Sequence, residues 1–358
     1  MKILHISDIV NPNGNGVAVA MSYYLKYEEK YEDVAVYNLN KDFSCECKKI
    51  FNKSNFNSIS LLPNGFNKPD LVVFNEVYKK EYLKIYKYCL KNNIPYIIIP
   101  HGCLVKIAQN KKRIKKILGN LLFFNKFIKN AIAIQFLNNE EKENTKIKYK
   151  NYIISGNGVD DFEKENINNE NEKELIYIGR YSIYHKGLDM LAKICNDYSS
   201  WFRNNKVKII LYGRSSTNDL EILNELIKKY KIKDILIVNG PVYGGEKRNV
   251  LTSSYAFIQT SRHEGQPMGI VEAMALGLPC IVTEGTNFSN FINEHKCGIG
   301  VKFDSLEIFN AIKKICMSNE LRNDYAKNSI KSAKDYFSWN KIIKNLDSNY
   351  KSIIEGRK

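Results

Sequence analysis

The stretch SSYAFIQTSRHEGQPMGIVEAMALGLPCIVTE, residues 253–284, decides the fold class. Residues 253–261 are β-branched and aromatic, which predicts a short strand. Pro267 suits a first helical turn, where an N–H would have no partner, and residues 268–276 are apolar at helical spacing. A glycine and a proline end this helix, and residues 280–284 resume as a strand. The order strand, loop, helix, strand predicts a parallel α/β sheet.

Two glutamates in this unit are candidate ligand groups. Glu264 follows the strand, and helical side chains tilt toward their N-terminus, so Glu272 should lean toward the same end of the sheet. The helix start is partly positive and suits a phosphate. Carboxylates beside a phosphate would repel it unless they bind neutral donors such as sugar hydroxyls. A ligand with both phosphate and sugar hydroxyl groups is a sugar nucleotide. The alternative interpretation makes Glu264 a helix-entry charge and Glu272 part of a solvated helix face.

Composition limits the class of protein. The 358 residues are 44% hydrophobic and suit two domains. No apolar run reaches the ~18 residues of a membrane span, and the first ten residues do not resemble a signal peptide, so we expect a cytoplasmic protein. The eight cysteines are scattered without a metal-binding spacing, which favours free thiols and no metal site.

The chain is strongly basic. Its 54 Lys and Arg residues against 38 Asp and Glu residues give a net charge of +16, which favours acidic partners. The excess is concentrated in residues 111–130, where lysines alternate with apolar residues, as in helices that lie on an anionic membrane. The alternative is a surface helix that packs on its own domain. We expect no nucleic-acid partner, because no nucleic-acid-binding motif accompanies the charge.

Strand and helix patterns alternate along the chain and break once, in the polar tract 161–174. We therefore predict two doubly wound domains whose strand ends face each other across a cleft, 1–158 and 159–336, and a terminal helix in 337–358 that packs back on the first domain. The predicted strands lie within residues 2–7, 34–39, 70–75, 95–102, 131–137, 152–160, 174–179, 206–213, 233–240, 255–261 and 279–284.

Other candidate ligand residues lie at predicted strand ends. Arg180 ends a strand and Lys186 precedes a helix, so both cations should reach the same edge of the second sheet, where they could neutralise a diphosphate. In so basic a chain, chance placement is the alternative. His101 ends a strand of the first domain, where ligand groups gather. Gly14 and Gly16 resemble half of a dinucleotide fingerprint or form a simple strand-to-helix turn.

Several segments resemble the retaining glycosyltransferases of family 4, which have the two-domain GT-B fold. The segments are YIGRYSIYHKGLDML (177–191), VNGPVYGGEK (238–247) and SRHEGQPMGIVEAMALGLPCIVTEGT (261–286), with GNG (14–16), PHG (100–102) and GNGVD (156–160) in the first half. The two glutamates separated by seven residues are the most specific feature. The GNG segment departs from the adjacent glycines of many members, which affects the acceptor side.

The resemblance implies a role for each candidate. Arg180 and Lys186 would bind the diphosphate, Glu264 and His101 the transferred sugar, and Glu272 the ribose. Backbone groups near the substrate would come from Gly14, Gly16, Val242, Gln266, Pro267, Met268, Gly269 and Ile270. In this interpretation Glu264 positions the sugar and is not a nucleophile.

We expect a metal-independent, retaining enzyme without a cofactor. The sequence has no Asp-x-Asp pair, and the two cations can stabilise a departing diphosphate of a UDP-sugar or GDP-sugar. The basic segment 111–130 favours a lipid-linked glycan acceptor at the inner face of the plasma membrane, as in surface-polysaccharide, lipopolysaccharide or glycolipid assembly. The alternatives are a sugar-nucleotide epimerase of the same fold and a basic binding protein without catalysis. A dehydrogenase is disfavoured because Val19 occupies a fingerprint position for glycine or alanine.

Overall fold

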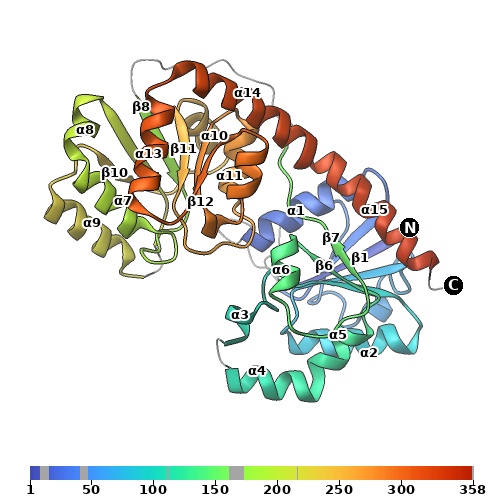
Figure 1. The fold of residues 1–358 in the computed structure, drawn as a ribbon. Helices are drawn as coiled ribbons and strands as arrows, with labels where there is room; N and C mark the ends of the chain where they lie inside the picture. The colour runs from blue at the N-terminus through green and yellow to red at the C-terminus, as the bar shows by residue number, and fades with distance from the viewer. Residues whose placement is uncertain (9–15, 41–46, 111–112, 161–172, 216, 357–358) are drawn as a thin grey trace. The chain divides into compact units, whose positions relative to one another are not determined.

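The computed structural model describes the chain except residues 9–15, 41–46, 111–112, 161–172, 216 and 357–358 (Figure 1). It comprises two compact units. Unit 1 contains Met1–Asn157 and Trp339–Lys358, and unit 2 contains Gly158–Ser338. Each unit has one parallel sheet covered by helices on its faces. The predicted α/β class with two doubly wound domains is confirmed.

The sheet of unit 1 has seven strands in the order β3-β2-β1-β4-β5-β6-β7. The chain reverses its direction of progress across the sheet between β1 and β4, and ligands of such sheets bind outside the carboxyl ends of the strands at this switch point. The strands are β1 (Lys2–Ser7), β2 (Asp33–Asn38), β3 (Ile50–Asn52), β4 (Leu71–Asn75), β5 (Tyr96–Ile99), β6 (Ala133–Phe136) and β7 (Tyr152–Ile154).

The central strands of unit 1 are buried along their whole length, which explains their continuous apolar sequences. The helices around them are α1 (Gly16–Glu28), α2 (Lys80–Lys91), α3 (Lys106–Asn110), α4 (Arg113–Gly119), α5 (Asn125–Asn130), α6 (Asn139–Glu143) and α15 (Trp339–Glu355), with a 3₁₀ turn at Ile59–Leu61. A π-helical turn, Asn120–Phe124, joins α4 to α5.

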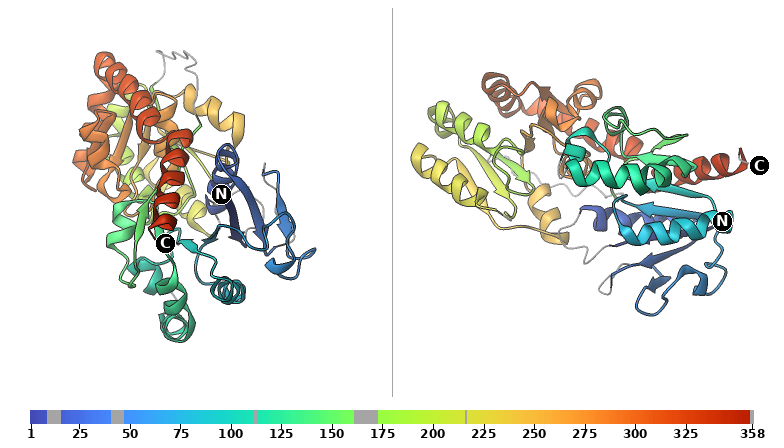
Figure 2. Two further views of the ribbon diagram at one scale, coloured as in Figure 1. Left: turned by 90° about the vertical axis from the view of Figure 1, so that its right-hand side faces the viewer. Right: turned by 90° about the horizontal axis from the view of Figure 1, so that it is seen from below.

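Helix α15 packs on α1, and both contribute to the same hydrophobic core of unit 1 (Figures 1 and 2). Trp339, the first residue of α15, is only 1% exposed. Its ring centroid lies 5.6 Å from that of Tyr23 in a stacked arrangement and 4.9 Å from that of Tyr24 in an edge-on one. The apolar stripe that the sequence shows at residues 339–354 is therefore the packing face of this helix.

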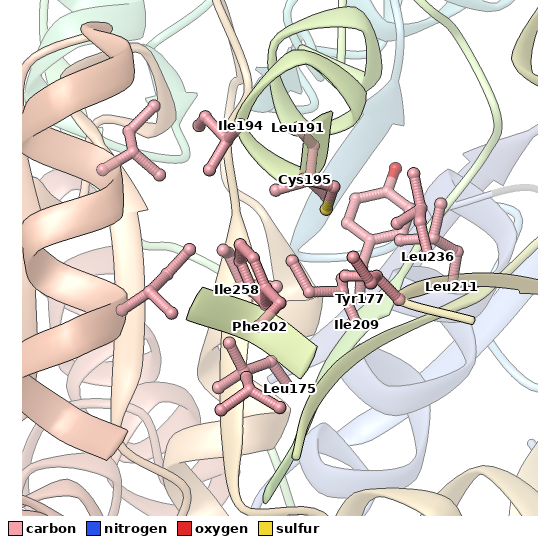
Figure 3. Packing of buried hydrophobic residues seen from close by; sticks show 14 of the residues in the cluster. Leu175, Tyr177, Leu191, Ile194, Cys195, Phe202, Ile209, Leu211, Leu236 and Ile258 are labelled. Atoms are coloured by element: carbon pink, nitrogen blue, oxygen red, sulfur yellow. The ribbon is translucent and has the colours of Figure 1, made fainter. Parts of the chain in front are cut away.

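The sheet of unit 2 has six strands in the order β10-β9-β8-β11-β12-β13, so its switch point lies between β8 and β11. The strands are β8 (Lys173–Ile178), β9 (Val207–Tyr212), β10 (Leu236–Asn239), β11 (Ala256–Gln259), β12 (Cys280–Thr283) and β13 (Gly298–Val301). One core, which includes Leu175, Leu191, Phe202, Ile209 and Ile258, packs on this sheet (Figure 3).

Helices cover both faces of the unit 2 sheet (Figure 1). They are α7 (Leu188–Asp197), α8 (Ser199–Asn204), α9 (Asp219–Tyr230), α10 (Gly244–Thr252), α11 (Met268–Ala275), α12 (Ser289–Glu294), α13 (Ser305–Cys316) and α14 (Asn319–Tyr336), with a 3₁₀ turn at Glu284–Thr286. The predicted helix at residues 268–276 is α11, which begins and ends within one residue of the prediction.

The sequence patterns did not predict two strands, β3 and β13, and they suggested one continuous helix for residues 111–130. The structure divides that segment into α4, the π-helical turn and α5. Most of the polar tract, 161–172, lies outside the described residues. Among the described helices, none is both long and apolar enough to cross a bilayer.

We predict that replacing Trp339 by alanine destabilises unit 1 by about 3–5 kcal/mol, because the change leaves a cavity among the α1 tyrosines. Hydrogen exchange would measure it: the α1 amides should exchange faster, whereas those of β11 in unit 2 should not. The exposed Lys344→Ala on the same helix is the control, expected within about 0.5 kcal/mol of the wild type. Equal protection of α1 in both variants would contradict the assigned packing.

Candidate functional site

The loops after β8 and β11 in unit 2 are in direct backbone contact at the switch point. Gly187, just before α7, has a φ of +66°, and a Cβ atom at this position would lie 1.9 Å from the carbonyl oxygen of Thr260. Only glycine permits this approach. The Thr260 hydroxyl donates to the Gly187 carbonyl at 3.1 Å, and the Arg262 N–H donates to the His185 carbonyl at 3.0 Å. The loop after β8 therefore lies directly against the loop after β11.

Arg262 reinforces this contact from the outside. Its guanidinium donates two hydrogen bonds to the Asp189 carboxylate, at 2.8 and 2.7 Å, and one to the Tyr184 carbonyl at 2.6 Å. It also lies between the rings of Tyr184 and Phe303, with centroids 4.3 and 4.2 Å from the guanidinium carbon. Bidentate and stacked contacts of this kind require arginine rather than lysine. The start of the loop that carries Glu264 is thus held against the loop after β8.

Glu264 is buried and hydrogen-bonded through one oxygen. Its Oε1 accepts from Lys186, from Ser261 Oγ at 2.6 Å and from Gln259 Nε2 at 2.8 Å. Asn287 Nδ2 also holds the Glu264 carbonyl at 2.6 Å. A buried carboxylate requires such partners. Within the described chain no hydrogen bond reaches Oε2, which leaves that oxygen able to accept from a ligand hydroxyl.

The pKa of the His185 imidazole depends on the charged groups around it. Burial is the largest cause of the lowered pKa of its imidazole, the Glu264 carboxylate acts in the opposite direction, and the charges of Lys186, Arg180 and His263 lower the pKa further. Its ring centroid lies 6.2 Å from that of His263. Arg180 is exposed at the end of β8, where its carbonyl accepts from the Tyr177 hydroxyl. Arg180, Lys186 and Glu264 therefore share one electrostatic neighbourhood around His185.

Glu272 lies in α11 and forms an ion pair with Lys247 of α10. The segment before Glu272, which contains Gln266, Pro267, Met268, Gly269 and Ile270, forms the loop and first turn of α11 at the carboxyl end of β11. The Ile270 N–H donates to the Pro267 carbonyl at 3.1 Å, which closes that turn. Val242 is buried in the loop between β10 and α10.

The other predicted residues belong to unit 1. His101 follows β5 with a φ of +49°, and its Nε2 lies 3.2 Å from Asn75 Oδ1. Burial lowers the pKa of the His101 imidazole to about 4. Gly16 is the first residue of α1, and Gly14 lies outside the described residues. His101 and Asn75 both lie at the carboxyl end of the unit 1 sheet, at β5 and β4.

Sequence reasoning did not identify the residues that hold the candidates in place. They are Asn75 in unit 1 and His185, Lys247, Gln259, Ser261, Arg262 and Asn287 in unit 2. A signal existed for three of them, since Asn75, Gln259 and Ser261 are polar residues at the end of an otherwise apolar predicted strand. Among the described residues, no group of three or more His, Cys, Asp or Glu side chains is placed to share a metal ion.

Comparisons with known proteins concern the family and the fold. The family "Glycosyl transferases group 1" matches residues 159–332. The amylovoran biosynthesis glycosyltransferase AmsD of Erwinia amylovora is 26% identical over 211 residues, 54% of this chain and 56% of that protein. The UDP-Gal:alpha-D-GlcNAc-diphosphoundecaprenol alpha-1,3-galactosyltransferase of Escherichia coli is 33% identical over 94 residues, 25% of this chain and 22% of that protein.

The matched segments span 22–56% of the length of the curated relatives. Among solved structures, that of Anabaena Alr3699/HepE in complex with UDP and glucose has a TM-score of 0.75 at 16% identity, covering 98% of this chain and 100% of that one. At this identity the likeness shows the fold alone. The chain therefore has the GT-B fold, and its residues 159–332 match the group 1 glycosyl transferases.

Proposed function

We propose that the protein is a retaining glycosyltransferase of the family 4 type. It moves a sugar from a nucleotide-diphosphate sugar, with UDP favoured over GDP, to a lipid-linked glycan acceptor in surface-polysaccharide or glycolipid assembly. The observation that carries the proposal is the grouping of Arg180, Lys186 and Glu264 at the switch point of a sheet whose sequence matches the group 1 glycosyl transferases.

The cations fit the leaving group of this reaction. Cleavage of the bond between sugar and diphosphate develops negative charge on the diphosphate and positive charge on the sugar. Arg180 and Lys186 stabilise the first, and the start of α11 adds the partial positive charge of its N–H groups. Lys186 pairs with Glu264, so a bound phosphate shares a cation that is already held in place.

The carboxylates fit the hydroxyl groups. Oε1 of Glu264 is occupied by three donors from the protein, so the carboxylate is fixed, and Oε2 can accept from a hydroxyl of the transferred sugar. Glu264 is therefore a positioning group in this mechanism. The acceptor attacks from the face that the diphosphate leaves and gives its proton to the diphosphate, which retains the configuration of the sugar. Glu272, paired with Lys247, accepts from the ribose hydroxyls.

The names of similar proteins support the substrate classes. The relative from E. coli is named for a UDP-sugar donor and a diphosphoundecaprenol-linked acceptor, and the Anabaena structure contains UDP and glucose. Both favour UDP as the leaving group here, and the first favours a lipid-linked acceptor.

The Arg180→Ala variant tests the assigned chemistry without threatening the fold, since this side chain is exposed. We expect its kcat for transfer from the preferred UDP-sugar to fall by about 10²–10³-fold, the typical effect of losing one charge-stabilising donor. Lys229→Ala, an exposed cation on α9, is the control and should keep wild-type turnover. Equal turnover of both variants would remove Arg180 from the mechanism.

The same assignment predicts independence from divalent metals, because Arg180 and Lys186 supply the positive charge that a metal would otherwise provide. Turnover of the purified protein in excess EDTA should equal turnover in added magnesium. Loss of activity in EDTA that magnesium restores would defeat this proposal.

A surface of unit 1 supports the membrane-bound acceptor. Six apolar side chains of helix α4 and the π-helical turn are exposed. Most of them are three or four residues apart, which places them on one side of the helix. The largest exposed fractions are 76% for Ile114 and 72% for Leu121. The set, here called the α4 surface, is Ile114, Ile117, Leu118, Leu121, Leu122 and Phe123. Three exposed lysines, Lys115, Lys126 and Lys129, accompany it.

The alternative of packing on its own domain fits only the end of this segment, where Phe124, Phe127 and Ile128 enter the core of unit 1. Helix α4 lies at the edge of unit 1 in Figure 1, and the side chains of the α4 surface are exposed. An exposed apolar surface beside lysines is complementary to an anionic lipid leaflet. We propose that it binds the inner face of the plasma membrane, where a lipid-linked acceptor would be presented.

Vesicle co-sedimentation tests the α4 surface. The double variant Ile117→Ser/Leu121→Ser should bind anionic vesicles at least about tenfold more weakly, because each change removes an apolar side chain from the lipid. The matched control, Leu61→Ser/Leu90→Ser, removes two exposed leucines elsewhere on unit 1 and should bind like the wild type. Unchanged partition of the first double variant would exclude this surface.

A further inference from the structure

A row of buried polar side chains crosses the core of unit 1 and ends at His101. It begins at Glu28, the last residue of α1, whose Oε2 lies 2.6 Å from Nε2 of His5 in β1. Both side chains are buried. Buried polar groups in an apolar sheet are costly unless they are paired, and apolar side chains would fill the same space without that cost, so the pair suggests a role other than packing.

Asn75, the last residue of β4, continues the row. Its side-chain Nδ2 lies 3.4 Å from the Ile6 carbonyl oxygen and 3.5 Å from His5 Nδ1, and its Oδ1 lies 3.2 Å from His101 Nε2. Tyr82 fixes the backbone of Asn75 by donating its hydroxyl to the Asn75 carbonyl. Asn75 therefore lies between the His5–Glu28 pair and the histidine that the sequence places in the site.

The hydrogen-bonding capacity of each group dictates where the protons are. A carboxylate only accepts, so Nε2 of His5 carries the proton and Nδ1 of a neutral His5 accepts. The Ile6 carbonyl also only accepts, so both neighbours require the NH₂ end of the Asn75 amide. The amide oxygen then faces His101, and because this oxygen only accepts, the proton of the His101 ring is on Nε2.

The turn that carries His101 is also held in place. His101 has a φ of +49° and Gly102 one of +79°, so two consecutive residues lie in the left-handed region, which is uncommon for a residue other than glycine such as His101. The buried carboxylate of Glu141 accepts from the Gly102 N–H and, at 2.8 Å, from the Leu137 N–H. The Nδ1 atom of His101 makes no hydrogen bond with any described residue.

We propose that Asn75, oriented by the His5–Glu28 pair, is a positioning residue that fixes His101 as the Nε2–H tautomer and so presents its Nδ1 as a hydrogen-bond acceptor for a substrate hydroxyl. The use of Nδ1 rests on the proposed function, whereas the tautomer does not. The low pKa of His101 supports this role, because the ring is neutral at physiological pH and only its tautomer then decides what it can bind.

Long-range ¹H–¹⁵N NMR spectra of ¹⁵N-histidine-labelled protein at pH 7 report the tautomer directly. In the wild type, we expect His101 Nε2 to show the shift of a protonated ring nitrogen and Nδ1 that of an unprotonated one. The His101→Asn variant assigns these signals, since asparagine tolerates the left-handed backbone at this position. A protonated Nδ1 in the wild type would overturn the proposal.

Two variants of Asn75 separate positioning from packing. Asn75→Ala removes the acceptor, so the His101 signals should shift toward the tautomer mixture of an exposed histidine. Asn75→Asp keeps an acceptor for His101 but loses the NH₂ donors toward His5 and the Ile6 carbonyl, so the protonated Nε2 signal of His101 should persist in this variant and weaken only in Asn75→Ala. Identical His101 signals in wild type and Asn75→Ala would show that Asn75 does not fix the ring.

Glu28→Met tests transmission along the row, since its side chain is of similar length but lacks the carboxylate. If His5 relays the constraint, the His101 signals change although Glu28 does not touch that ring; unchanged signals would exclude His5 and Glu28 from the role. In turnover, Asn75→Ala should lower kcat by up to about tenfold, the effect of one neutral hydrogen bond. The expected tautomer without any sugar transfer would defeat the proposed function alone.

Discussion

The contact of Gly187 with the carboxyl end of β11 is the constraint on which the arrangement in unit 2 depends. It leaves no room for a side chain between the two loops. The backbone contact therefore places Lys186, next to Gly187, close to Glu264 in the loop after β11. The hydrogen bonds from Thr260 and Arg262 fix the same contact. The ion pair thus accompanies the loop packing, and under the proposed function both side chains are already in place for a ligand that carries phosphate and hydroxyl groups.

Both units place polar residues at equivalent points of their sheets. In each, the strand order reverses beside the first strand of the sheet, and the strand on the other side of the reversal ends in a polar residue. Asn75 is the last residue of β4 and Gln259 the last of β11, and Ser261 and Glu264 follow β11 in its loop. They orient His101 in unit 1 and Lys186 in unit 2 through hydrogen bonds whose donors and acceptors admit only one arrangement.

Much of this was predictable because parallel sheets leave a strong pattern in sequence. Long apolar runs marked the central strands, and Pro267 marked the start of α11. β3 has only three residues, and β13 contains two glycines, so neither shows a strand pattern. Arg180, Lys186 and Glu264 could be grouped because strand ends meet at one edge. Lys247 could not be matched to Glu272, since that pairing depends on how α10 packs beside α11.

In the segment 111–130, the sequence alone does not determine which residues are buried. Its sequence offers apolar residues on more than one helical face, so periodicity alone supports both a membrane surface and a buried helix. The π-helical turn at Asn120–Phe124 adds one residue to a helical turn and so rotates α5 relative to α4. Phe127 and Ile128 consequently enter the core, while Ile114 and Leu121 remain exposed. Each interpretation of the sequence therefore fits one half of the segment, and only the exposed half has an apolar surface left for a partner.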